Sequence, residues 1–276
     1  LAANCGGALT VIGDPTGLFL WNMGHVTPTA YSSAMALPCL TAWLLPTWWI
    51  GRSLPETTET EWVTMPYRGD DTRLNIWQRL LMLFVGIGGL WFIPTFHRIT
   101  KLSPFLGAFC VLAVLWVVNE IFNRRLIDTD EMMQRRVPRV LQYGVIQMML
   151  YIMGIMLAVG VVQETGAVGW LVAQLDNYVG ATWVAGTLAA ALSTVLDSFT
   201  SALTFFTIGK SNGLNSDYWS MIAYSTAVGG NILCVGSLSG VAFLKTENAR
   251  VGWYISNVGW KAFVGAALGL AVMIVM

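Results

Sequence analysis

Long stretches of apolar residues with almost no charge are the feature that most restricts the folds open to this chain. Residues 29–50 contain no charged side chain, and residues 256–276 contain only Lys261. Each stretch is about 20 residues long, which is enough for a helix to cross the hydrocarbon core of a bilayer. Only 11% of the residues are charged and 55% are hydrophobic, whereas a soluble domain carries about 25% charged residues. The sequence therefore predicts an all-α polytopic membrane protein rather than a barrel of short alternating strands.

A glycine-rich motif interrupts the apolar sequence twice. Residues 6–17 read GGALTVIGDPTG and residues 229–240 read GGNILCVGSLSG, so the second copy begins 223 positions after the first. At this offset four glycines coincide, and so do three further pairs: Asp14 with Ser237, Thr16 with Ser239, and Tyr31 with Tyr254. Because glycine and proline break helices, each copy predicts a membrane helix that unwinds near its middle. The two copies indicate an internal duplication.

We expect the chain to be helical throughout, with charged loops at 51–75 and 123–139. A broken segment at 1–26 precedes full spans at about 29–50, 77–96, 104–122 and 140–163, and residues 164–182 contain a short surface helix. Residues 183–209 are apolar except for LDSFTS near their middle, so two half-length helices that meet at 197–201 would form a re-entrant hairpin. A second broken span at 218–246 and a final span at 254–276 complete the chain.

This organisation divides the chain into parts of two repeats. Residues 1–50 end the first inverted repeat, residues 51–75 form a cytoplasmic linker, and residues 76–276 form the second repeat. A complete first repeat would need counterparts for residues ~79–228, so we expect roughly 150 further residues upstream, as repeat architecture requires. We therefore interpret the chain as a fragment.

The basic residues predict the orientation of the spans. With 183–209 as a hairpin, ten Lys and Arg residues fall in loops on one side, and three, namely Arg98, Lys101 and Lys210, fall on the other. Cytoplasmic loops carry the excess of basic residues. The two broken segments then cross in opposite directions, which predicts the inverted-repeat fold of secondary transporters, whose discontinuous helices form binding sites near the midplane. Lys261 lies near the inner end of the last span, where we expect its side chain to snorkel to the interface.

Two carboxylates and several neutral oxygens lie at the predicted interruptions. A carboxylate at the centre of a bilayer costs about 3 kcal/mol on insertion scales, so an ionisable residue inside a membrane indicates function. A structural role is the alternative, because Asp14 precedes Pro15 and is suited to cap the following helix. Asp197 has the same alternative as the cap of a turn. The candidates form three groups: Asn4, Asp14 and Thr16; Asp197, Ser198, Thr200 and Ser201; and Asn231, Ser237 and Ser239.

These oxygen ligands suit a small hard cation, and they lack the thiolate and imidazole groups that transition metals favour. A buried carboxylate also binds protons, because a low dielectric disfavours its charged form. We therefore expect Asp14 and Asp197 to hold sodium and protons in competition. An anion site would more naturally use glycine-rich helix N-termini without a carboxylate. The four cysteines form no CxxC pair, and the net charge of zero gives no reason to expect nucleic acid as a partner.

The first motif resembles a family signature. ANCGGALTVIGDPT at 3–16 is similar to the ANxGGxxxxIGDxT signature of NhaD-type sodium/proton antiporters, in the ion transporter superfamily. GIMLAVGVVQETG at 154–166, LDSFTSALT at 196–204 and GGNILCVGSLSG at 229–240 resemble later segments of that family. The resemblance implies ion-binding roles for Asn4, Asp14, Thr16, Asp197, Ser198, Asn231 and Ser237. Three positions depart from the family pattern: Ser198 replaces its usual Asn, Phe199 its Pro, and Gly17 its second Thr.

The sequence thus predicts a multi-pass protein of the inner (plasma) membrane that exchanges sodium or lithium for protons by alternating access. We expect neither a cofactor nor an enzymatic activity, and the superfamily resemblance implies a homodimer. The alternative transport function is a sodium-coupled carrier of anions such as dicarboxylates or arsenite. A third alternative is a protein that does not transport by exchange: a channel, or a membrane subunit whose repeats only pack against partners.

Overall fold

The computed structural model describes residues 1–53, 76–123, 146–166, 182–209, 212–247 and 249–276. These residues form helices and turns and no strand. Within these described ranges, four helices are long and apolar enough to cross a membrane: Pro28–Arg52, Ile76–Thr100, Pro104–Phe122 and Val251–Val275. The predicted all-α membrane class is therefore confirmed. The predicted surface helix within 164–182 and both charged loops lie almost entirely outside the described residues.

The chain divides into two compact units, which are described separately. Unit 1 comprises Leu1–Leu54 and Gly154–Met276, and unit 2 comprises Pro55–Met153. The predicted repeats were bounded differently, at 50 and 76, so the compact units cut across them: the first broken segment packs with the end of the chain. The helices of unit 1 are α1 (Ala2–Ala8), α2 (Pro15–Asn22), α3 (Pro28–Arg52), the part of α8 (Ile146–Glu164) from Gly154, α10 (Thr182–Val195), α11 (Ser198–Ile208), α12 (Asp217–Leu233), α13 (Leu238–Thr246), α14 (Val251–Tyr254), the π-helical turn η3 (Ile255–Gly259) and α15 (Trp260–Val275).

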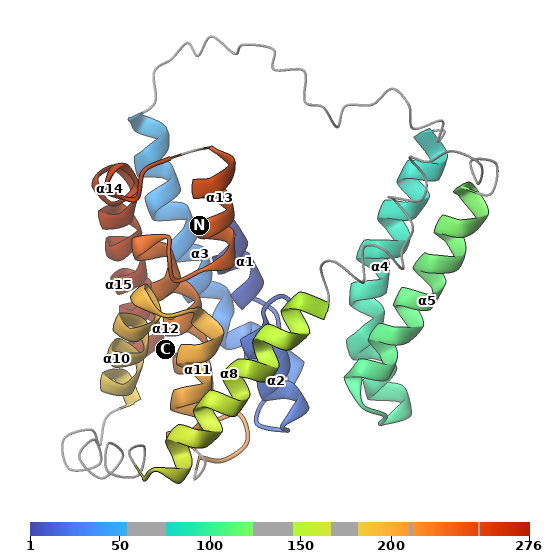
Figure 1. Ribbon diagram of the computed structural model, residues 1–276, viewed down its shortest axis with the longest axis horizontal. Coiled ribbons are helices and arrows are strands. Elements are labelled where there is room, and N and C mark those ends of the chain that lie inside the picture. Colours follow the sequence, from blue (N-terminus) through green and yellow to red (C-terminus); the bar gives the residue numbers. More distant parts are fainter. Residues whose placement is uncertain (54–75, 124–145, 167–181, 210–211, 248) are drawn as a thin grey trace. The chain divides into compact units, whose positions relative to one another are not determined.

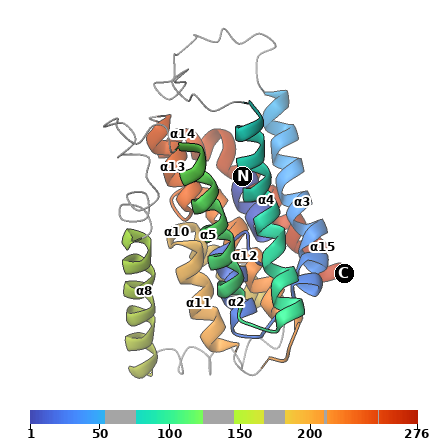
Figure 2. The same cartoon turned by 90° about the vertical axis from the view of Figure 1, so that its right-hand side faces the viewer.

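Helix α12 is the centre of unit 1 (Figures 1 and 2). Every residue from 218 to 231 is buried, including Trp219, Ile222 and Tyr224. A helix that is buried on all sides belongs to the core of a protein. Since α12 leads directly into the second glycine-rich motif, that motif is surrounded by protein, as irregular backbone at membrane depth requires.

Helices α10 and α11 run in opposite directions along α12. Gly186 of α10 faces Met221, and Ala190 faces Gly229, so α10 runs parallel to α12. In contrast, the start of α11 lies near the end of α12, because the Ser198 N–H donates to the Gly236 carbonyl at 3.2 Å.

The far end of α11 returns to the start of α12. There the Tyr218 hydroxyl donates to the Phe205 carbonyl at 2.8 Å. Residues 182–208 therefore form a hairpin whose turn is Leu196–Asp197, and both outer ends lie beside the first turns of α12 (Figure 1). The helical break is shorter than the 197–201 that the sequence predicts, because Asp197 caps α11 and Ser198 already begins it.

The first broken segment runs antiparallel to α12. Near its start Asn4 contacts Asn231, with the two side-chain amides 2.8 Å apart. Near its end the His25 ring stacks on Trp219 with centroids 4.2 Å apart, and the Thr27 N–H donates to the Asn215 side chain at 2.7 Å. As the numbering rises from 4 to 27 along one segment, it falls from 231 to 215 along its partner.

The long helices α3 and α14–α15 also pack antiparallel. Trp49 contacts Trp260 edge to face, with centroids 4.5 Å apart, and Gly269 lies against the Pro38 carbonyl. A Cβ on Gly265 would clash with Pro46. Small residues of this kind allow membrane helices to approach closely.

Unit 2 contains a helical hairpin of α4 (Ile76–Thr100) and α5 (Pro104–Asn123). Gly89 lies against Val111, and Gly107 lies against Phe96, so the two helices are antiparallel. The outer faces carry exposed apolar side chains such as Phe84, Trp91 and Phe109. A soluble surface rarely exposes a continuous apolar patch of this kind, whereas a membrane helix presents it to lipid.

Candidate functional site

Each of three helix breaks in unit 1 ends at an oxygen side chain that caps the next helix. Asp14 accepts a hydrogen bond from the Thr16 N–H at 3.0 Å, and Asp197 accepts one from the Phe199 N–H at 3.2 Å. Ser237 accepts one from the Gly240 N–H at 3.2 Å. Both aspartates therefore have the capping role that the sequence offered as the structural alternative, and this role does not exclude ion binding. A cap uses only part of a carboxylate, which has about four acceptor positions.

The two glycine-rich motifs share the backbone conformation of the residue that caps the following helix. Asp14 has φ −134° and ψ 142°, and Ser237, 223 positions later, has φ −140° and ψ 143°. A Cβ on Gly7 would lie 2.9 Å from the Gly13 carbonyl oxygen, and a Cβ on Gly230 would lie 2.8 Å from that of Gly236. These glycines are needed because the backbone folds back onto itself at both breaks. The sequence duplication thus corresponds to a similar helix cap and a similar close approach of two glycines, whereas Cys234 has a left-handed backbone, with φ 64°, and its counterpart Val11 does not.

A polar cluster joins the first motif to the second. The Asn4 amide donates to Asn231 Oδ1 at 2.8 Å, and the Ser239 hydroxyl donates to Asn4 Oδ1 at 2.6 Å. Ser237 and Ser239 place their hydroxyl oxygens 3.5 Å apart. The Asn231 amide also lies 3.7 Å from the Cys5 sulfur. Asn4 of the first segment therefore meets Asn231, Ser237 and Ser239 of the second, although more than 220 residues separate the two segments along the chain.

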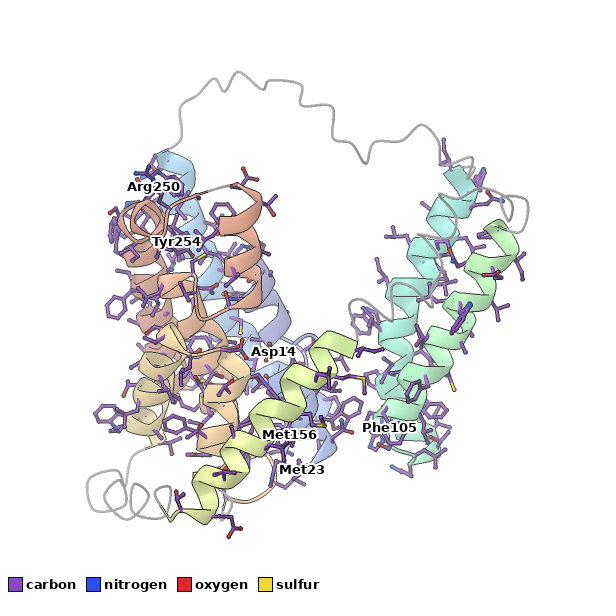
Figure 3. All side chains as sticks on the ribbon, viewed as in Figure 1. Asp14, Met23, Phe105, Met156, Arg250 and Tyr254 are labelled. Carbon is purple, nitrogen blue, oxygen red and sulfur yellow. The ribbon has the colours of Figure 1, made fainter. Side chains whose placement is uncertain are left out.

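The two carboxylates belong to the same region. Asp197 is close enough to Asp14 for its charge to act on that carboxylate, and both side chains are half-buried. The hairpin turn is tied to the second motif by the hydrogen bond between Ser198 N–H and the Gly236 carbonyl at 3.2 Å. On the other side Phe19 of α2 packs against Phe199 of α11, with centroids 6.1 Å apart. Figure 3 labels Asp14 at the break between α1 and α2.

Two hydroxyl groups near the carboxylates are fully buried: Ser201 Oγ has no hydrogen-bond partner, and Thr16 Oγ1 faces only the Asp14 carboxylate. Both residues are fully buried, at 0% exposure. An unsatisfied buried hydroxyl costs about 1–3 kcal/mol, so a bound ion would offset this cost. Thr16 was among the predicted ion ligands. Ser201 was named with the hairpin tip, and its backbone N–H donates to the Asp197 carbonyl at 3.0 Å, in the first turn of α11.

The remaining predicted residue, Thr200, is not joined to the cluster by any hydrogen bond among the described residues. Its backbone N–H faces the Asp197 carboxylate together with those of Ser198 and Phe199, and its carbonyl accepts from the Thr204 hydroxyl at 3.1 Å. Tyr254 is a contact that the sequence analysis missed: its hydroxyl donates to the Asn231 carbonyl at 2.8 Å. The only signal was its coincidence with Tyr31 at the 223-residue offset.

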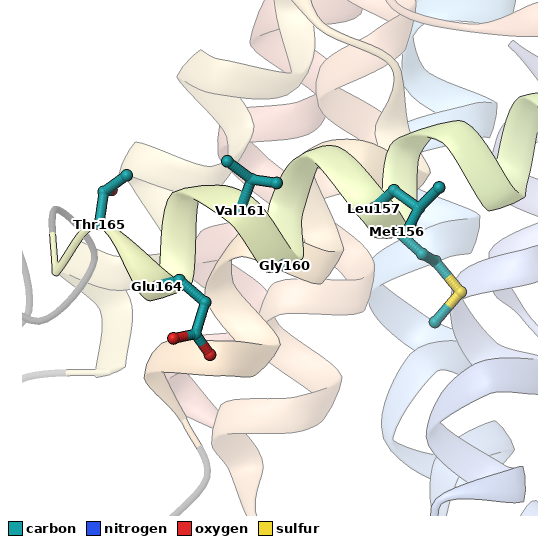
Figure 4. Close-up of a pocket in the computed structure, with 6 residues that line it drawn as sticks. All are labelled: Met156, Leu157, Gly160, Val161, Glu164 and Thr165. Atoms are coloured by element: carbon teal, nitrogen blue, oxygen red, sulfur yellow. The ribbon is translucent and has the colours of Figure 1, made fainter.

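The described residues contain no group of three or more His, Cys, Asp or Glu side chains that could hold a metal ion. The site instead offers two carboxylates with amide and hydroxyl oxygens, which are hard ligands. A separate surface hollow lies along α8 (Figure 4) and is lined by Met156, Leu157, Gly160, Val161, Glu164 and Thr165. Because five of these residues belong to α8, Thr165 directly follows it, and none is a candidate residue, this hollow is not the site.

Long apolar helices, two interrupted helices and a polar cluster where the interruptions meet define a multi-pass α-helical membrane protein of the transporter class. The chain matches the model of the family described as "Citrate transporter" over residues 1–229, which is most of its length. The chain therefore belongs to this family.

Curated relatives carry more specific names. "Sodium/proton antiporter 1" of Arabidopsis thaliana is 28% identical over 276 residues, which covers 98% of this chain and 46% of the relative. "Na(+)/H(+) antiporter NhaD" of Vibrio cholerae is 24% identical over 298 aligned positions, which covers 100% of this chain and 59% of the relative. The resemblance to NhaD-type antiporters that the motifs predict is thus confirmed. The chain spans about half the length of these relatives, and no solved structure matches it.

Proposed function

We propose that the complete protein exchanges sodium for protons, and that Asp14 and Asp197 hold both ions in turn. The observation that carries this proposal is that α2, which Asp14 caps, packs against α11, which Asp197 caps, with Phe19 and Phe199 centroids 6.1 Å apart, so that two carboxylates lie in one region. Relatives named as sodium/proton antiporters support the same chemistry.

The electrostatics of the pair explain why the two ions compete. Two negative charges in a low-dielectric site repel each other, so the pair needs a positive charge to remain there. A sodium ion between the carboxylates supplies that charge when both are ionised. When sodium leaves, a proton neutralises one carboxylate instead. A site with these two occupied states and no stable empty state couples the movement of one ion to that of the other.

Neutral oxygens complete the proposed coordination. The hydroxyls of Ser201 and Thr16 are the strongest candidates, because an ion would satisfy the unpartnered Ser201 hydroxyl and could be shared by Thr16 and the Asp14 carboxylate that it faces. Asn4, Asn231 and Ser237 fix the position of the two loops through their mutual contacts. Ser198 and Thr200 contribute backbone N–H groups that hold Asp197 in place.

Alternating access would follow from an inverted repeat. The first broken segment runs antiparallel to α12, and α3 runs antiparallel to α15, which supports two repeats of opposite orientation. The hairpin of α10 and α11 would be re-entrant, with its turn near the midplane. Basic residues favour a cytoplasmic position for the loops that follow α3 and α13, in the inner (plasma) membrane, and the homodimer remains an expectation from the superfamily.

The sodium-coupled anion carrier is less well supported. The candidate residues include two carboxylates and no Lys or Arg, so their charge repels a dicarboxylate. Uptake of an anion driven by sodium would favour the carrier, whereas ion flux that does not saturate with sodium would favour a channel.

The test uses the complete protein in proteoliposomes with a pH-sensitive dye inside. Sodium added outside drives proton movement in the wild type, and Asp14→Asn or Asp197→Asn reduces it to the level of empty liposomes. Asp217→Asn is the matched control, because Asp217 is exposed in the first turn of α12 and should leave exchange intact. Full sodium-driven exchange by Asp14→Asn would overturn the proposal.

A further inference from the structure

A group of cations and tryptophans lies where the C-terminal end of α3 meets α15. We call it the basic–aromatic end, and it comprises Trp48, Trp49, Arg52, Trp260 and Lys261. Neither α3 nor α14–α15 contains an acidic residue. Helix α3 is long enough to cross a membrane and ends at Arg52, so this end of α3 lies at the level where tryptophans and basic side chains meet lipid headgroups.

The sequence predicts that the Lys261 side chain snorkels to the interface, and the structure shows a more specific contact. Its side chain is only 7% exposed, and its ammonium donates to the Ser53 hydroxyl at 3.1 Å. No carboxylate pairs with it among the residues that the structure describes. A buried ammonium with a neutral partner retains most of its desolvation cost, so this position favours an anionic ligand.

Arg52 supplies a second charge at the same end. Its guanidinium lies 4.0 Å from the centroid of the Trp48 ring, a cation–π contact that fixes the direction of the side chain. Ser53, the partner of Lys261, directly follows Arg52 in the chain. The side chains of Arg52 and Ser53 are both exposed, so the Arg52 charge can be reached from outside the helix pair, and Lys261 lies directly behind Ser53.

We propose that the basic–aromatic end binds the phosphate group of an anionic phospholipid. Arg52 and Lys261 would donate to the phosphate oxygens, and the exposed rings of Trp48, Trp49 and Trp260 would contact the glycerol and the upper acyl chains. Basic pockets between membrane helices recognise headgroups in this way, and aromatic rings occupy the same depth. The site is separate from the proposed ion cluster and does not depend on sodium/proton exchange.

The test measures lipid retention by the full-length protein. The protein is placed in nanodiscs of phosphatidylcholine and phosphatidylglycerol, released, and examined by native mass spectrometry for bound phosphatidylglycerol. Arg52→Gln should weaken retention about 5-fold, and Arg52→Gln with Lys261→Gln about 30-fold, at about 1 kcal/mol for each charge near the membrane surface. Lys261→Arg keeps the charge and should retain the lipid. Arg98→Gln, which removes an exposed charge at the end of α4, is the matched control.

A competition arm distinguishes lipid from free phosphate. Inorganic phosphate at millimolar concentration should not displace phosphatidylglycerol, because it lacks the chains that contact the tryptophans. The proposal is overturned if the double variant retains phosphatidylglycerol like the wild type, or if Arg98→Gln loses it equally. If inorganic phosphate displaces phosphatidylglycerol, the lipid proposal is also overturned, and the ligand is a phosphate ion. Since Arg52 has no structural hydrogen bond in the described part of the chain, Arg52→Gln remains informative even if the Lys261 variants fold poorly.

Discussion

Replacing Tyr254 by Phe should weaken sodium binding without touching any ion ligand. The Tyr254 hydroxyl is buried and donates to the Asn231 carbonyl at 2.8 Å, in the last turn of α12 where the carbonyls lose their helical partners. Figure 3 labels Tyr254 at the end of α14, directly before the π-helical turn η3. Tyr254 is thus a positioning residue: it holds the backbone of Asn231, whose side chain joins the polar cluster through Asn4.

The magnitude follows from the bond that is lost. A buried carbonyl left without its donor costs about 1–3 kcal/mol. If about 1 kcal/mol of this cost weakens sodium binding because the site is less ordered, the half-saturating sodium concentration rises about 5-fold. The maximal exchange rate stays near the wild-type value. The remainder appears as a lower unfolding temperature. The assay is sodium-dependent dye quenching in proteoliposomes, with thermal unfolding in detergent measured alongside.

The matched control is Tyr218→Phe. The Tyr218 hydroxyl makes the same kind of bond, to the Phe205 carbonyl at 2.8 Å, but at the end of α12 that lies away from the breaks. It should lower the unfolding temperature and leave the sodium dependence unchanged. The reasoning is refuted if both variants raise the half-saturating sodium concentration equally, or if Tyr254→Phe changes neither quantity.

Three further predictions concern the duplicated motif, the hairpin and the effect of pH. Gly230→Ala should destabilise the protein by about 1–3 kcal/mol, because the added Cβ would lie 2.8 Å from the Gly236 carbonyl oxygen. Gly6 has open space around it, so Gly6→Ala should be neutral or slightly stabilising in thermal unfolding. Ser201→Ala should raise the half-saturating sodium concentration about 5-fold, as expected for the loss of one ligand worth about 1 kcal/mol. The control Ser225→Ala removes another unpartnered hydroxyl, on α12, and should leave this concentration unchanged. Equal effects of the two variants would exclude Ser201 as a ligand. The half-saturating sodium concentration should rise as the pH falls, by at most about tenfold per unit for one competing proton, and sodium titrations that coincide at pH 6 and pH 8 would contradict competition.

The sequence predicts the local features of this protein well. The glycine spacing in 6–17 and 229–240 indicates where the helices break, because backbone that folds back on itself excludes a Cβ. The position of Asp14 before Pro15 predicts its capping role, and the structure adds that Ser237 performs the same role in the second copy. Both inferences depend only on residues close together in the chain.

Contacts between distant segments could not be predicted in the same way. The bond between Asn4 and Asn231 depends on the antiparallel packing of two segments more than 220 residues apart, and no local pattern encodes that register. Thr200 and Ser201 are equally polar in the sequence, yet the start of α11 at Ser198 buries the Ser201 hydroxyl and not that of Thr200. Lys261 was expected to extend toward the interface, but no local pattern shows that its ammonium donates to Ser53, which follows α3.

The most direct test of one pocket that holds either sodium or a proton is the number of protons released when sodium binds. Isothermal titration calorimetry of the purified full-length protein, in two buffers with different ionisation enthalpies, gives this number. We predict that sodium binding releases close to one proton near neutral pH, and that Asp14→Asn and Asp197→Asn each abolish the release. Sodium binding that leaves the proton count unchanged, or release that persists in either variant, would contradict the account.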